Sequence, residues 1–231
     1  MKRVLLKLSG EALAGPAKKG FDEAVVMNVA RQVRELTVAG TQVGIVIGGG
    51  NFWRGRTSNT IDRTRADQIG MLATVMNCIY VSEIFRYAGM KTSVMTPFAC
   101  GSMTELFSKE RAVSALERGE VVFFAGGTGH PYFSTDTATV LRAIEIEAEI
   151  ILLAKSIDGV YDSDPAVNRD AKKYEEITIG EVIEKKLGVV DMTASILCME
   201  NKMPMLVFGL EGEDSIVRAA SGENTGTRVT V

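Results

Sequence analysis

The chain is poor in the residues that build disulfide frameworks and metal sites. Its 231 residues include three cysteines (Cys78, Cys100 and Cys198) and a single histidine, His130. The cysteines are odd in number and widely scattered, and no Cys-x-x-Cys pair occurs, which argues against a disulfide framework and against a structural zinc site. We therefore expect reduced, buried thiols in a cytoplasmic protein.

Several common signatures are also missing. No Gly-x-x-x-x-Gly-Lys-Ser/Thr P-loop occurs, no Gly-x-Gly-x-x-Gly opens a helix, and no Gly-x-Ser-x-Gly elbow is present, which argues against P-loop, dinucleotide and acyl-hydrolase sites. The net charge of −3 offers no basic excess for a nucleic acid partner. Lys7 interrupts the short apolar run at the N-terminus, and we expect no signal peptide and no membrane-spanning segment.

What the chain does contain is an alternation of strand-like and helix-like segments. Hydrophobic residues make up 46% and charged residues 24%, as in ordinary globular proteins. The expected strands are Arg3–Leu8, Val43–Ile47, Thr92–Met95, Val121–Ala125, Ile150–Leu153 and Met205–Phe208, with Gly226–Val231 as a candidate edge strand. The alternation predicts one α/β domain over residues 1–231, with helices on both faces of a mainly parallel sheet.

The expected helices follow from periodicity and from their end signals. They cover residues 26–36, Arg65–Ala88, Glu105–Arg118, a segment opening at Ser134 or Thr135, Ile179–Leu187 and Thr193–Asn201. The second of these is apolar nearly all the way round. A helix of that kind is buried, and in a chain of this size we expect burial against a second subunit.

Three expected strands run into turns rich in glycine and hydroxyl groups. These turns are Ser9-Gly10, Gly48–Gly50 and Gly126–Gly129. Glycines let the backbone approach a ligand closely, and open N–H groups in turns and at helix N-termini bind anions. Because ligands of open α/β sheets bind beyond the carboxyl ends of the strands, the three turns are predicted to line one crevice.

Charged residues near these turns suit phosphoryl transfer between two phosphate-bearing ligands. Lys7 and Arg54 are the candidate cations, and Asp136 or Asp191 are the candidate organising carboxylates. Catalysis of this kind depends on positioning and on neutralising the charge of the transferring group.

At these residues the chain resembles the bacterial uridylate (UMP) kinases of the amino acid kinase superfamily. The matching segments are Lys7–Leu13, Ile47–Gly55, Ala66–Asn77, Gly127–Thr137, Arg142–Ala148 and Asp158–Pro165, in family order over almost the whole chain. The resemblance implies a three-layer α/β/α sandwich and Mg²⁺-dependent transfer of the ATP γ-phosphoryl group to UMP, giving UDP in pyrimidine nucleotide synthesis. The Mg²⁺ is expected to come with the ATP phosphates, without a metal site formed by protein side chains alone.

The resemblance also assigns residues to the two nucleotides. It implies that ATP is bound by Lys7, Leu8, Ser9, Gly10, Gly50, Arg54, Lys155, Tyr161 and Asp164. It implies that UMP is bound by Gly49, Asp67, Thr128, Gly129, His130, Pro131, Tyr132, Phe133, Ser134 and Thr135. A homohexamer with GTP as activator and UTP as inhibitor is implied as well, although the Lys155-Ser156 segment and the Gly15–Phe21 loop vary within the family.

Two other kinds of protein would share parts of this sequence pattern. A superfamily kinase acting on a carboxylate or carbamate would share the lysine and the glycine turns, but not Gly127–Asp136 as it stands here. A non-catalytic nucleotide- or oxyanion-binding storage or regulatory protein on the same fold would have no need of Lys7, Arg54, Asp136 and Asp191 together.

His130 stands where the resembled family usually has asparagine. The change is either a tolerated polar substitution or a source of pH-dependent UMP binding, because imidazole titrates near neutrality. Under the second interpretation, the UMP KM of the wild type and that of His130→Asn follow different profiles from about pH 6 to pH 8. Parallel profiles would leave the simple substitution as the explanation.

Overall fold

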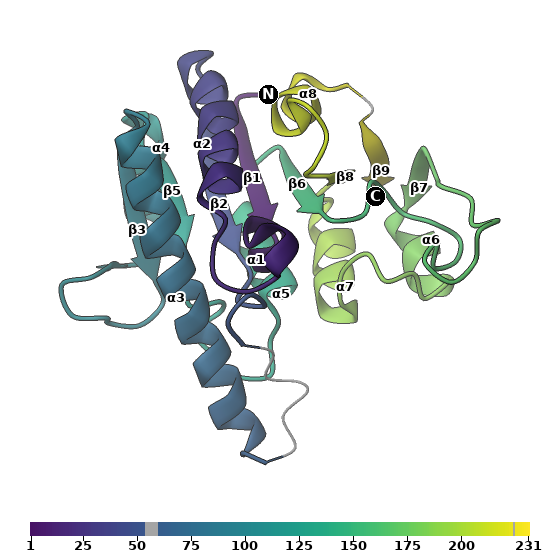
Figure 1. Cartoon of the computed structure of the whole chain (residues 1–231), viewed down its shortest axis with the longest axis horizontal. Coiled ribbons are helices and arrows are strands. Elements are labelled where there is room, and N and C mark those ends of the chain that lie inside the picture. Colours follow the sequence, from purple (N-terminus) through teal and green to yellow (C-terminus); the bar gives the residue numbers. More distant parts are fainter. Residues whose placement is uncertain (54–59, 224) are drawn as a thin grey trace.

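A sheet of short apolar strands runs through the centre of the molecule in the computed structural model (Figure 1), which describes residues 1–53, 60–223 and 225–231. Within these residues the strand order is β4-β3-β5-β2-β1-β6-β8-β9-β7. The strands are β1 (Arg3–Leu8), β2 (Gln42–Ile47), β3 (Thr92–Thr96), β4 (Glu105–Leu106), β5 (Val121–Phe124), β6 (Ile150–Lys155), β7 (Glu176–Thr178), β8 (Met205–Gly209) and β9 (Gly226–Thr230). All neighbouring pairs are parallel except β8 with β9, so the expected mainly parallel sheet is confirmed.

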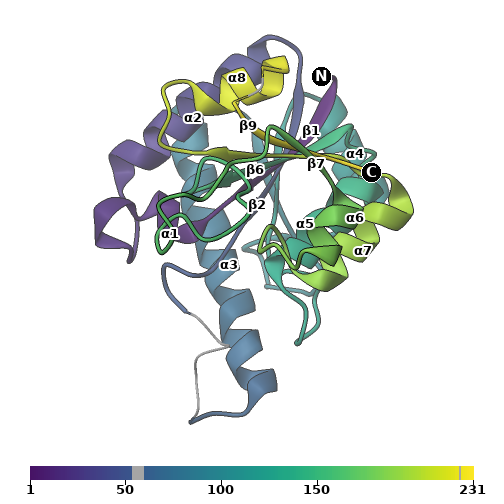
Figure 2. The same cartoon turned by 90° about the vertical axis from the view of Figure 1, so that its right-hand side faces the viewer.

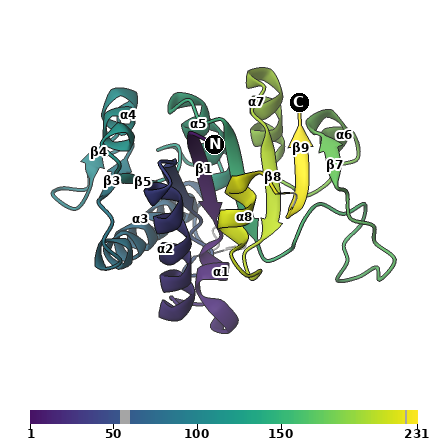
Figure 3. The same cartoon turned by 90° about the horizontal axis from the view of Figure 1, so that it is seen from above.

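Helices cover both faces of this sheet, which confirms the three-layer α/β/α arrangement (Figures 2 and 3). The helices are α1 (Gly10–Leu13), η1 (Gly15–Ala17), α2 (Glu23–Val38), α3 (Arg63–Tyr87), α4 (Lys109–Glu117), α5 (Thr135–Glu145), α6 (Ile179–Glu184), α7 (Met192–Asn201) and α8 (Ser215–Ser221). One buried apolar cluster joins α2, α3 and α8 to the sheet, and a second joins α4, α5, α6 and α7 to its other face. The central strands are therefore buried on both sides, which explains their continuous apolar runs.

Four segments differ from the sequence expectation. The helix expected over Glu105–Arg118 begins only at Lys109, where the Ser108 hydroxyl caps it, and Glu105–Leu106 form the short strand β4. Strand β9 is not an edge strand, because it lies between β8 and β7. The elements β7 and α8 are short and partly polar, so neither stood out in the sequence as a strand or a helix.

Helix α3 is half buried and half exposed. Its inner face contacts the sheet, where Phe85 packs edge to face on Phe123 with ring centroids 5.2 Å apart. Its outer face carries Ile69, Leu72 and Met76, which are 41%, 54% and 50% exposed. The single chain covers only one face of α3, and the expected burial of the other face against a second subunit stays a prediction.

By length and composition alone, α3 is also apolar enough to cross a membrane. Its most apolar 18-residue window has a mean hydropathy of 1.3, so the expectation that no segment approaches a membrane span is wrong on this measure. Core helices of globular proteins pass the same test. Here the helix packs along β2, β3 and β5 as part of one helical layer.

The sheet order brings the carboxyl ends of β1, β2, β5 and β6 together. β1 pairs with β2 on one side and with β6 on the other, and β2 pairs with β5. The chain moves outward from β1 to β2 and later returns past it to β6, so the direction of winding changes at β1. Such a switch point is where an open α/β sheet leaves a crevice for ligands.

Candidate active site

The turns after β1 and β2 pack backbone against backbone. The Gly48 N–H donates to the Leu8 carbonyl at 3.0 Å. A methyl group added at Gly10 would lie 2.4 Å from the Gly48 carbonyl oxygen and equally near Asn51 Oδ1. Only glycine fits this contact, and two of the three glycine-rich turns thus meet at one edge of the sheet.

The third turn, after β5, leads into α5 and a helix N-terminus. Ser134 is the N-cap of α5, and its hydroxyl accepts from the N–H groups of Asp136 and Thr137 at 3.0 and 3.2 Å. The Thr135 hydroxyl is 3.7 Å from the position that a methyl group at Gly48 would occupy. The helix start and the turn after β2 therefore face the same crevice, where the N-terminal end of the α5 dipole favours an anion.

Two lysines and one carboxylate meet at this point. Lys7 Nζ on β1 is 2.8 Å from Asp136 Oδ1, in the first turn of α5, and both side chains are largely buried. Lys155, at the end of β6, donates to the Val189 carbonyl. Burial lowers the pKa of Lys155, the nearby charge of Lys7 lowers it further, and the carboxylate of Asp136 partly opposes both effects. The cluster is therefore rich in positive charge before any anion arrives.

Asp191 lies beside this cluster but is held by two helix ends. It is the N-cap of α7 and accepts from the Ala194 N–H at 3.0 Å. It also accepts from the hydroxyl groups of Ser134 and Thr137, so it joins the start of α7 to the start of α5. These contacts make Asp191 a group that fixes the α5 N-terminus.

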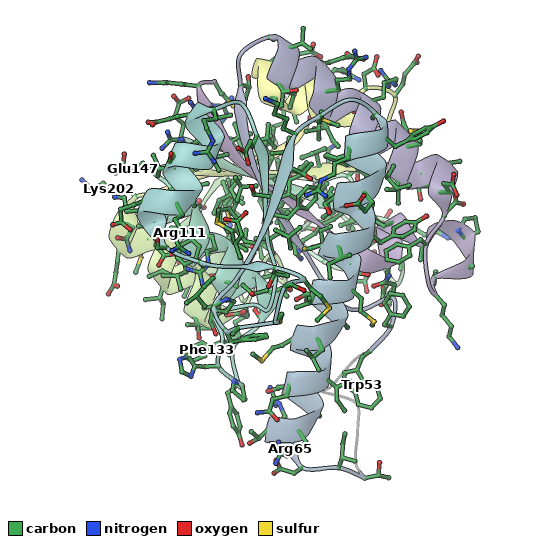
Figure 4. All side chains as sticks on the ribbon, turned by 90° about the vertical axis from the view of Figure 1, so that its left-hand side faces the viewer. Trp53, Arg65, Arg111, Phe133, Glu147 and Lys202 are labelled. Carbon is green, nitrogen blue, oxygen red and sulfur yellow. The ribbon has the colours of Figure 1, made fainter. Side chains whose placement is uncertain are left out.

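A small cavity of about 120 Å³ lies between α3 and the loop that precedes α5. It is lined by Arg63, Ala66, Asp67, Gly70, Met71, Thr74, Gly127, Thr128, His130, Phe133, Ser134 and Thr135. Asp67 Oδ2 accepts from the Tyr132 N–H and from Arg63 Nε, each at 2.8 Å. Six of the residues assigned by resemblance to UMP thus lie on one cavity, whereas Gly129, Pro131 and Tyr132 belong to the same loop without lining it. Figure 4 shows Phe133 and Trp53 on opposite sides of the projecting end of α3.

A second hollow of about 420 Å³ lies beyond β6. It contains Lys155, Tyr161 and Asp164, three of the residues assigned by resemblance to ATP. The Tyr161 hydroxyl donates to Asp158 at 2.8 Å, and this bond raises the pKa of Tyr161. The opposite wall is formed by Lys185, Lys186, Leu187, Gly188 and Val189, none of which is among the residues expected at the site. In the sequence, this wall is indicated only by the lysine pair that follows α6. Such a pair usually indicates a solvent-exposed helix end and not a ligand site.

The remaining assigned residues are distributed around these cavities. Ser9 and Lys155 also line a third hollow of about 610 Å³, formed with η1, α2 and the segment after β8. Gly50 lines a fourth, next to Glu11, Lys18 and Lys19. Gly49 instead packs on α3, where an added methyl group would be 2.9 Å from the Gly70 carbonyl oxygen. Arg54, expected to be both a catalytic and an ATP-binding residue, lies outside the described residues.

This site has the features of an anion-binding crevice of an open α/β sheet, with two lysines, a helix N-terminus and glycine turns at one edge of the sheet. The chain matches the amino acid kinase family over residues 2–209, and it belongs to that family. It is similar to a UMP kinase from Bacillus anthracis, with 36% identity, a TM-score of 0.95, and 99% of this chain and 96% of that chain covered. It is also similar to a UMP kinase from Ureaplasma parvum, with 35% identity, a TM-score of 0.94 and coverage of 100% and 99%. A uridylate kinase from Archaeoglobus fulgidus aligns over 100% of both chains with 25% identity and a TM-score of 0.75.

The close contact at Gly10 predicts a loss of stability when that residue is enlarged. In Gly10→Ala the new methyl group would meet a backbone carbonyl, which cannot rotate away, so we expect the free energy of unfolding to fall by about 1–3 kcal/mol. Gly180→Ala is the matched control, because the nearest atom to its added methyl group is 3.9 Å away. Urea unfolding followed by circular dichroism measures both. Equal stability of the two variants would contradict the tight packing of the first two turns.

Proposed function

We propose that this chain is a UMP kinase that transfers the γ-phosphoryl group of Mg-ATP to UMP, giving UDP and ADP in cytoplasmic pyrimidine nucleotide synthesis. The observation that carries the proposal is the meeting of Lys7, Asp136 and Lys155 between two cavities. Similarity to two UMP kinases along the whole chain supports UMP as the acceptor. One domain over residues 1–231 would hold both nucleotides.

ATP fits the hollow beyond β6 with its phosphates directed towards β1. In this arrangement, Tyr161 and Asp164 hold the adenosine end, and the lysines bind the phosphates. Lys7 offsets the negative charge that accumulates on the transferring group, while Asp136 keeps the lysine in place. Leu8, Ser9, Gly10 and Gly50 contribute turn backbone to the same phosphates.

Magnesium would arrive with the ATP phosphates. In residues 1–53, 60–223 and 225–231, no three or more side chains of His, Cys, Asp or Glu converge as a metal cage. Mg²⁺ bound to nucleotides keeps several waters and needs only one or two protein carboxylates. Asp136, beside Lys7, is the carboxylate that we place next to it, and the ion would neutralise charge on the transferred group.

We place UMP in the cavity between α3 and the loop before α5. Asp67 uses Oδ2 for Arg63 and Tyr132, and we place the ribose hydroxyl at Oδ1. Hydroxyl groups and turn N–H groups between Thr128 and Thr135 would bind the base and phosphate. The cavity is smaller than the ~300 Å³ at the low end for ligand sites, so Tyr132 and Phe133, 64% and 51% exposed, would move outward on binding.

No general base is needed for this reaction. The acceptor phosphate is already an anion, so the protein has to hold two anions in line and offset their repulsion. We further propose a homohexamer regulated by GTP and UTP. The exposed apolar face of α3, with Ile69, Leu72 and Met76, is a surface that a second subunit would cover.

Substitution of Lys7 tests the proposed activity directly. With ATP and Mg²⁺, a coupled ADP-release assay should show turnover with UMP and little or none with CMP, dUMP or acetylglutamate. Lys7→Ala should lower kcat by ~10²-fold or more, because it removes charge stabilisation of the transferring group. Lys109→Ala is the matched control, since Lys109 pairs with Glu147 on the surface. Tight nucleotide binding without turnover in the wild type would favour the non-catalytic binding protein.

The lowered pKa of Lys155 predicts proton uptake when ATP binds. Its pKa lies below the ordinary value of 10.5 mainly because of burial, so at about pH 9 more of it is neutral than of an exposed lysine. Triphosphate oxygens nearby favour the charged form, raise the pKa and draw a proton from solvent. Calorimetry of a non-hydrolysable ATP analogue in two buffers of different ionisation enthalpy measures this uptake. It should disappear in Lys155→Met; equal uptake by both proteins would contradict the placement.

A further inference from the structure

Helix α3 contacts two glycine-rich turns through buried polar side chains on one face. The Thr74 hydroxyl accepts from the Gly126 N–H at 2.8 Å, at the start of the turn after β5. The Asn77 amide donates to the Gly48 carbonyl at 2.7 Å, in the turn after β2. Thr74 and Asn77 are only 2% and 0% exposed, and their spacing of three residues puts them side by side on the helix.

The contact with the turn after β2 is reinforced in two ways. Asn77 and Asn51 exchange amide hydrogen bonds of 2.8 and 3.0 Å, and Asn51, 3% exposed, also donates to the Gly20 carbonyl at 2.8 Å. Gly49 lies against the helix so closely that an added methyl group would be 3.1 Å from the Ala73 side chain. Both hydrogen bonding and steric fit therefore fix this turn on α3.

About two turns of helix towards the N-terminus, the same face reaches the loop that follows the turn after β5. Asp67, seven residues before Thr74, accepts from the Tyr132 N–H at 2.8 Å. The face that carries Asp67, Thr74 and Asn77 thus runs along the whole crevice, while the apolar residues Val75, Val81 and Phe85 serve the core. Polar groups are buried on this helix where it passes the turns, and burying them is favourable only because the turns supply partners.

A helix is well suited to set a distance between two loops. Its rise of about 1.5 Å per residue puts Thr74 and Asn77 roughly 4.5 Å apart along the axis, and its backbone hydrogen bonds keep that spacing rigid. The turns themselves are short and rich in glycine, so their own conformations fix their separation poorly.

We propose that Thr74 and Asn77 are positioning residues that hold the turn Gly48–Gly50 and the turn Gly126–Gly129 in register on α3. This inference rests on the proposed function, in which Gly50 of the turn after β2 serves the donor phosphates and the turn after β5 serves the acceptor. Register between the turns then sets the distance between the transferring and attacking groups. A displacement of about 1 Å from a reactive geometry can cost ~10²-fold in rate.

Thr74→Val tests this with little change of shape, because it replaces the hydroxyl by a methyl group and leaves the Gly126 N–H without its acceptor. We expect kcat to fall by ~10- to 100-fold while the KM values for UMP and ATP change by less than about threefold, since the residues assigned to each nucleotide are unchanged. Thr74→Ser retains the acceptor and should restore kcat to within about threefold of the wild type.

Ser82→Ala is the matched control on the same helix. Ser82 is 2% exposed, and its hydroxyl donates to the Ile79 carbonyl at 2.8 Å, just as Thr74 donates to the Met71 carbonyl at 2.7 Å. Ser82 lies two turns of helix beyond Thr74, away from the glycine turns, so its loss should alter stability and leave kcat within about twofold. Thermal unfolding of each variant identifies any effect that is due to stability alone.

A bisubstrate probe, adenosine and uridine joined by a 5′–5′ pentaphosphate, provides a readout of register. Calorimetry should show that Thr74→Val weakens binding of the probe by ~10-fold or more, while UMP and an ATP analogue bind almost as they do to the wild type. Asn77→Ala acts on the other turn. It should likewise weaken binding of the probe while binding of UMP and of the ATP analogue changes little. This second variant tests the proposal even if Thr74→Val does not fold.

The results that overturn the inference differ from those that overturn the proposed function. Wild-type protein without UMP turnover and without probe binding would reject the function and the inference with it. Normal wild-type turnover, together with folded Thr74→Val or Asn77→Ala variants whose kcat and probe affinity match those of Ser82→Ala, would reject the inference alone. Variants that raise both KM values and leave kcat unchanged would also reject it, because weaker binding of each nucleotide is not loss of register.

Discussion

The constraint on which the crevice depends is the distance between the backbones of the first two turns. Gly10 faces the Gly48 carbonyl with no room for a side chain, and the Gly48 N–H closes the contact on Leu8. This packing brings the carboxyl ends of β1 and β2 close together, as the proposed binding of one anion by backbone groups from both turns requires. Any residue with a side chain at Gly10 would separate the turns, and the N–H groups would then point to different places.

The electrostatics of the site follow from this geometry. Lys7 and Lys155 approach from neighbouring strands, and Asp136 compensates only part of their charge. Burial lowers the pKa of Lys155 in the ligand-free protein, and the phosphate of the proposed nucleotide would offset that effect. The positive charge is thus oriented before the ligand binds, which is the condition under which electrostatic stabilisation of a transition state costs no reorganisation of the protein.

The sequence predicts the parts of this arrangement that depend on local signals. Apolar runs followed by glycine located β1, β2 and β5, and the hydroxyl and acidic residues at the start of α5 located its N-terminus. Other features depend on contacts between distant segments. The wall at Lys185–Val189, the place of β9 inside the sheet and the joining of α5 to α7 by Asp191 all need the tertiary fold before they exist. From the sequence, Asp191 could be recognised only as a candidate carboxylate of the site, and its contacts with both helix ends could not be predicted.

In helix α3, the hydrophobic pattern of the sequence does not predict which side chains are buried. Its composition indicated a helix buried on all sides, yet polar Thr74 and Asn77 lie inside while apolar Leu72 and Met76 lie outside. A periodicity analysis assigns polar residues to solvent, because it has no knowledge of turns whose backbone groups need partners. This arrangement of buried polar and exposed apolar side chains gives the helix two separate roles. Its polar face meets the glycine turns, and its apolar face is left for another surface, so the residues that disturb the sequence pattern are the ones that connect this helix to the site.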